Sequence, residues 1–73
     1  MFSFLVASID INTASLEEFV ELKGVGEKKA RLIVDYRTKI GCFTNIEELI
    51  KIKGIGQKTI SNNENTLKLG KCK

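Results

Sequence analysis

Two copies of a glycine- and lysine-rich segment contain the residue types with the clearest chemistry in this sequence. Residues 22–30 and 52–60 each hold a Gly-apolar-Gly turn, with one lysine before it and another soon after it. Two glycines around one apolar residue suit a tight reversal between helices, because glycine adopts backbone angles that other residues avoid. The next helix then begins at the turn, where its first N–H groups lack intrahelical partners and carry the positive end of the helix dipole. A phosphate oxygen could accept from those groups, next to a lysine charge.

The candidate anion-binding residues therefore lie in and around the two turns. They are Lys23, Gly24, Val25, Gly26, Lys28 and Lys29 in the first copy, and Lys53, Gly54, Ile55, Gly56, Lys58 and Thr59 in the second. One copy alone would fit an ordinary corner of a helical bundle equally well. Two copies, each with lysine on both sides of its turn, favour anion binding.

Composition limits the classes of protein that this chain can belong to. With 73 residues it is one small domain, of a size that buries only about 60% of its unfolded surface. The formal net charge of +3 is a weak pointer to acidic partners. The chain has no histidine and two cysteines, so it lacks the usual general base and the four ligands of a structural zinc site. We therefore expect neither enzymatic activity nor a metal centre.

Apolar residues at helical spacing flank each turn and predict the elements that position it. Ser15 and Glu18 form a capping box before a first helix, which ends at Gly24. A second helix is predicted over about residues 27–39, with Gly41 as its stop.

The second unit repeats the first at an offset of thirty residues. Its capping pair is either Thr44 with Glu47 or Asn45 with Glu48. Residues 16–30 and 46–60 share six identical positions, and most of the others pair apolar with apolar, so this is an internal repeat. After residue 60 the match decays into a stretch poor in helix formers, and we expect a short, frayed last helix. The prediction is an all-α fold of four short helices, forming two helix-hairpin-helix units related by a pseudo-two-fold axis.

The two ends of the chain are assigned to separate segments. Residues 1–8 are apolar and end in small side chains, which we interpret as the remnant of a secretory signal peptide; the alternative is a hydrophobic arm packed on the domain. Residues 9–67 then form the tandem helix-hairpin-helix domain, and residues 68–73 a basic C-terminal tail.

In order and spacing, six segments of the chain resemble the tandem helix-hairpin-helix domain of ComEA-type competence proteins. They are residues 11–19, 22–26, 30–37, 41–43, 46–49 and 53–59, so the resemblance covers roughly residues 9–66. It implies sequence-independent binding of double-stranded DNA outside the cytoplasmic membrane, during DNA uptake for natural transformation, with the uptake machinery as a further partner. The DNA contacts it implies are Gly24, Val25, Gly26 and Lys28 in one hairpin, and Gly54, Ile55, Gly56 and Lys58 in the other.

The resemblance has further implications and some departures. Hairpins of this kind can hold a sodium or potassium ion on backbone carbonyls, although no residue here demands one. Lys23 and Lys53 stand where the family often has proline, the last helix is degenerate, and no transmembrane anchor is visible. Export would place the chain in the periplasm or another extracytoplasmic space; the alternative is the cytoplasm. An exported domain of this size would gain from a disulfide between Cys42 and Cys72. The alternative is a buried Cys42 with Cys72 on a disordered tail, and spacing does not decide between them.

Two other functions remain open at this point. One is a protein-interaction module that uses the apolar hairpin tips Val25 and Ile55. The other is a fragment of a DNA repair enzyme, although a chain of this length has no room for a base-flipping pocket.

Overall fold

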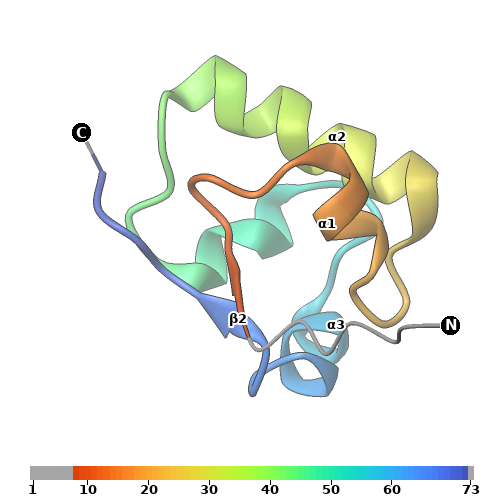
Figure 1. Ribbon diagram of the computed structural model, residues 1–73. Helices are drawn as coiled ribbons and strands as arrows, with labels where there is room; N and C mark the ends of the chain where they lie inside the picture. The colour runs from red at the N-terminus through yellow and green to blue at the C-terminus, as the bar shows by residue number, and fades with distance from the viewer. Residues whose placement is uncertain (1–7, 73) are drawn as a thin grey trace, which may run out of the picture.

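The fold, taken from a computed structural model, is described for residues 8–72 and is mostly helical (Figure 1). Within that range the elements are β1 (Ile9–Asp10), α1 (Leu16–Val20), α2 (Gly26–Ile40), the 3-10 helix η1 (Ile46–Lys51), α3 (Gln57–Asn62) and β2 (Leu67–Lys68). The predicted set of four short helices is confirmed, and a small sheet is present in addition. None of the helices in the described range is long and apolar enough to cross a membrane. The expected signal-peptide remnant, residues 1–8, lies outside the described residues except for Ser8.

α1 and α2 form the first unit. α1 begins directly after Ser15, as predicted, but it ends at Val20 rather than at Gly24, because the chain already turns there with the Leu22 N–H bonded to the Phe19 carbonyl at 3.1 Å. The capping box is confirmed, because Ser15 Oγ accepts the Glu18 N–H at 3.2 Å and the Glu18 carboxylate accepts the Ser15 N–H at 2.9 Å. Two donors at the start of α1 are thereby satisfied. α2 exceeds the predicted range 27–39 by one residue at each end. It stops at Gly41, whose φ of 93° favours glycine.

η1 opens the second unit as a 3-10 helix rather than an α-helix. Of the two predicted capping pairs, Asn45 with Glu48 is the one that forms, and Asn45 Oδ1 accepts the Glu48 N–H at 3.1 Å. The backbone N–H and the hydroxyl of Thr44 also donate to the Glu48 carboxylate, and these bonds, the backbone one above all, lower the pKa of that carboxyl below its usual value. The equivalent run in the first unit, α1, is α-helical, so the shared apolar spacing is compatible with either form.

Both units contribute to one shared core. Phe19 from α1 and Phe43 from the loop before η1 are its largest fully buried side chains. The Arg37 guanidinium lies 5.5 Å from the centre of the Phe19 ring and donates to the Ile11 carbonyl at 3.0 Å. This side chain therefore covers one side of the core. The buried apolar residues are Ile9, Ile11, Ala14, Phe19, Leu22, Val25, Ala30, Ile33, Phe43, Leu49, Ile52, Ile55 and Ile60.

A two-stranded parallel sheet joins the two ends of the domain. Ile9 pairs with Leu67 and Asp10 with Lys68. The Ile9 N–H donates to the Thr66 carbonyl at 2.7 Å. The segment assigned to a basic tail, residues 68–73, therefore starts inside β2 and lies against the domain as far as the structure describes it.

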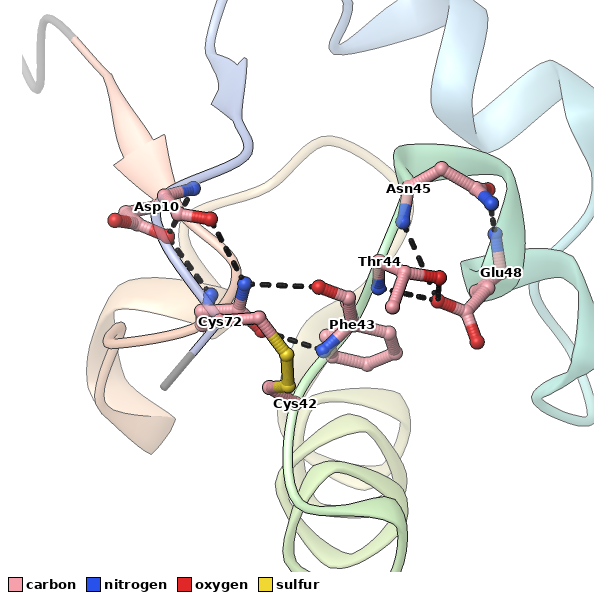
Figure 2. Close-up of a disulfide and its surroundings, with 9 residues drawn as sticks. Asp10, Cys42, Phe43, Thr44, Asn45, Glu48 and Cys72 are labelled. Atoms are coloured by element: carbon pink, nitrogen blue, oxygen red, sulfur yellow. Dashed lines mark hydrogen bonds between the residues drawn. A yellow bond between two sulfur atoms is a disulfide. The ribbon is translucent and has the colours of Figure 1, made fainter.

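The disulfide between Cys42 and Cys72 fixes the C-terminal segment to the loop after α2 (Figure 2). Their Cα atoms are 5.5 Å apart, within the range that a disulfide spans without backbone movement. Of the two alternatives that spacing left open, the structure has the bonded one. Asn12 supports the same junction, because its amide donates to the carbonyls of Phe43 at 3.0 Å and Gly70 at 3.1 Å.

Candidate nucleic-acid interface

The two turns have the same pattern of burial, residue for residue. We call residues 22–28 hairpin 1 and residues 52–58 hairpin 2. In each, the first and fourth residues are buried and the others are exposed. The Val25 N–H donates to the Leu22 carbonyl at 3.2 Å, and the Ile55 N–H donates to the Ile52 carbonyl at 3.0 Å. Each turn is thus anchored by two apolar residues and leaves its glycine and lysine positions in solvent.

The apolar residues at the hairpin tips point into the core. Val25 is 6% exposed and Ile55 is 4% exposed. Their side chains anchor the turns, so any ligand at these positions would meet backbone atoms only. This burial is at odds with a protein-interaction module built on exposed apolar tips, because neither tip offers a side-chain surface.

The glycines of the two hairpins differ in one respect. Gly24 and Gly54, at the first position, have φ of 78° and 90°, which L side chains rarely adopt. At the second position Gly26 has φ of 67°, whereas Gly56 is extended, with φ of −120°. α2 therefore begins at Gly26 itself, while α3 begins one position later relative to the repeat.

Four hairpin lysines have their charges free in solvent. Lys23, Lys28, Lys53 and Lys58 are all exposed. Within residues 8–72 the one ion pair joins Arg31 to Glu27 at 3.4 Å. None of these four lysines therefore takes part in an ion pair within that range.

Charge is distributed unevenly between the hairpins. Residues 21–31 contain four basic and two acidic side chains, whereas residues 51–61 contain three basic and no acidic ones. Both regions are therefore net positive, and hairpin 2 has no opposing charge in its own segment.

The hairpins lie next to each other in space, on the side of the domain away from the C-terminus (Figure 1). Lys29, at the start of α2, joins them. Its ammonium group donates to the Gly24 carbonyl at 3.3 Å. Its methylene carbons pass over Gly54, where an added Cβ would lie 3.1 Å from Lys29 Cε. Lys29 thus connects two lysine-rich turns that are thirty residues apart in the sequence.

In hairpin 1 the Lys29 ammonium donates to the Gly24 carbonyl, one of the backbone oxygens that a monovalent cation at this turn could use. The binding of such an ion stays a prediction.

The sequence prediction missed one residue at this surface. Asn63 follows α3, and its side chain forms hydrogen bonds to both backbone groups of Lys23 in hairpin 1. Its signal in the sequence is a polar residue at the repeat position where the first unit has Ile33, which is buried. From the sequence alone this difference indicates decay of the repeat. Thr59, which is among the predicted residues, is partly buried, and its backbone carbonyl accepts a hydrogen bond from the Asn63 amide.

Comparison with known families gives one informative match. The family model described as the helix-hairpin-helix motif matches residues 6–68, a range that includes both hairpins and all the helices. Comparison with curated proteins gives no match. The motif implies DNA binding in general terms.

Proposed function

The chain belongs to the helix-hairpin-helix family, and on that premise we propose that it binds double-stranded DNA without sequence preference, through phosphate contacts at hairpins 1 and 2. The observation that carries the proposal is the pairing of two turns with the same burial pattern on one side of the domain (Figure 1), each with exposed lysines outside any ion pair of the described residues. Contacts to phosphate fix a protein on the duplex but read no base sequence.

Backbone groups supply the first part of the contact. The N–H groups at the start of a helix have no intrahelical partner, and α2 and α3 each begin at a hairpin. No atom lies within 4 Å of where a Cβ would stand on Gly26 or Gly56, so a phosphate could approach the backbone closely there.

Lysine side chains supply the second part. Each Lys–phosphate contact releases a counterion, which gives the affinity its dependence on salt. Lys28 and Lys58 each lie two residues after the second glycine of a turn. The two contacts should therefore be equivalent in kind and should reinforce each other on a single duplex.

The biological setting that we propose is DNA uptake outside the cytoplasm, as the resemblance to ComEA-type competence proteins implies. Two findings support it. The match to the helix-hairpin-helix motif spans the region of the resemblance, and a disulfide such as Cys42–Cys72 persists mainly in oxidising compartments. In this role the protein is a binder rather than an enzyme, and it would hand the duplex to the uptake machinery.

Charge reversal at both hairpins tests the proposal. Between about 1 M and 0.1 M salt, each phosphate contact raises the affinity by about 0.9 decades. The loss of two contacts should therefore weaken binding at 0.1 M salt about 60-fold. The repulsion between the new carboxylates and the phosphates should weaken it further. The Lys28→Glu, Lys58→Glu double variant should show this loss with an unchanged helical circular dichroism spectrum, because both side chains are exposed. The matched control is Glu17→Lys, at an exposed position of α1. Binding that survives in the folded double variant would place the DNA surface elsewhere on the molecule.

A further inference from the structure

Among residues 8–72, Asn63 is the one polar side chain that is buried, at 4% exposure. Its amide forms three hydrogen bonds. Oδ1 accepts the Lys23 N–H at 2.8 Å, while Nδ2 donates to the Lys23 carbonyl at 3.0 Å and to the Thr59 carbonyl at 2.7 Å. This pattern fixes the orientation of the amide, because a flipped amide would set donor against donor and acceptor against acceptor.

These bonds connect the two hairpins. Lys23 belongs to hairpin 1, whereas Thr59 directly follows Lys58 at the start of α3, the helix that leaves hairpin 2. A single side chain therefore holds the backbone of one hairpin against the helix start of the other. Lys29 makes the reverse connection, from α2 to Gly54.

The internal repeat shows that packing alone does not require a polar residue here. The equivalent position in the first unit is Ile33, which is fully buried. Burial of an amide is unfavourable unless its hydrogen bonds are made. The hydrogen bonds of Asn63 join the second unit to Lys23 in the first unit. A polar side chain at this position therefore holds the two hairpins in place relative to each other.

We propose that Asn63 is a positioning residue, whose amide holds hairpin 1 at a fixed orientation to hairpin 2 so that Lys28 and Lys58 engage one duplex together. The inference rests on the proposed DNA-binding function. With the hairpins fixed in advance, binding at one brings the other to its phosphate at little further entropic cost. Without the Asn63 bonds, hairpin 1 loses its polar attachment to α3, and the contribution of Lys28 to binding should fall while that of Lys58 stays.

A double-mutant cycle tests the proposal. Affinity for a duplex of arbitrary sequence is measured at 0.1 M salt for Lys28→Ala and Lys58→Ala, each with Asn63 and with Asn63→Ile, which installs the residue type of the first unit. With Asn63 present, each lysine change should weaken binding about eightfold. In the Asn63→Ile background Lys28→Ala should cost about twofold or less, and Lys58→Ala should still cost about eightfold.

Two further variants keep the test decisive. Asn62→Ala, at an exposed position next to Asn63 in α3, is the matched control and should leave both lysine effects unchanged. Asn63→Asp keeps the shape but sets carboxylate oxygens against two carbonyls, and it replaces Asn63→Ile if that variant does not fold. Circular dichroism and thermal unfolding establish that each variant is folded at the assay temperature.

The outcomes separate the two claims. If Lys28→Ala costs the same in both Asn63 backgrounds, Asn63 has a structural role only and the positioning proposal is overturned. If neither lysine change affects binding even with Asn63 present, the proposed DNA-binding function itself fails.

Discussion

Reduction of the Cys42–Cys72 disulfide should destabilise the domain severely. The bond joins residues separated by 30 positions, and in the chain-entropy description closing a loop of that length stabilises the folded state by about 3.6 kcal/mol at 25 °C. The Cα separation of 5.5 Å lies in the usual range for a disulfide. Small domains have total stabilities of about 5–15 kcal/mol, so the bond accounts for a large share.

The assay is thermal unfolding followed by circular dichroism, with and without reductant. For a domain of this size each kcal/mol corresponds to about 4–8 °C in Tm, so reduction should lower Tm by about 14–29 °C. The Cys42→Ser, Cys72→Ser double variant is the control, and it should unfold at the lower temperature regardless of reductant. A shift below about 5 °C, with both thiols shown to be free by mass spectrometry, would refute the reasoning.

The same experiment separates stability from binding. The C-terminus lies on the side of the domain away from hairpin 1 (Figure 1). Below its unfolding temperature, the reduced protein should therefore bind duplex DNA as tightly as the oxidised protein does.

Two further predictions concern the hairpin glycines and the cap of η1. Gly24→Ala should destabilise the fold by about 1–2 kcal/mol, because Gly24 has φ of 78°. Gly56→Ala should leave Tm nearly unchanged, because Gly56 is extended. It should weaken duplex binding, because the added Cβ would project into open space where the phosphate approaches. Equal Tm losses in the two variants would contradict this contrast. The lowered pKa of Glu48 means that its bonds to Thr44 stabilise the fold fully above the unfolded pKa of about 4.3, and that this contribution disappears as pH falls through the folded pKa. In urea denaturation the wild type should therefore have a higher free energy of unfolding than Glu48→Gln at pH 7, and this difference should shrink below about pH 4. A difference that is independent of pH would argue against the assigned bonds.

Local signals in the sequence predicted the elements of the fold well. The capping boxes at Ser15 and Asn45 depend on side chains three residues from their partners, so composition and spacing reveal them. The Gly24 and Gly54 turns were predictable because positive φ favours one residue type. The 3-10 geometry of the helix at residues 46–51 was not predictable, because its apolar spacing is the same as that of α1, which is α-helical.

Contacts between distant residues were not predictable in the same way. The amide of Asn12 bonds to Gly70, and that of Asn63 to Lys23 forty positions away, both through backbone groups that exist at every residue. No local pattern distinguishes such an asparagine from one in a loop. The sheet between Ile9 and Leu67 is two residues long on each strand, too short for any alternation to appear.

A salt titration of duplex binding tests the central claim most directly. Contacts with about four to six phosphates, shared between hairpins 1 and 2, predict that log K falls with log salt at a slope of about −3.6 to −5.4, with a Kd near micromolar at physiological salt. Duplexes of unrelated sequence should give the same slope and the same affinity. An affinity that does not change between low and high salt, or strong discrimination between unrelated duplexes, would contradict the account.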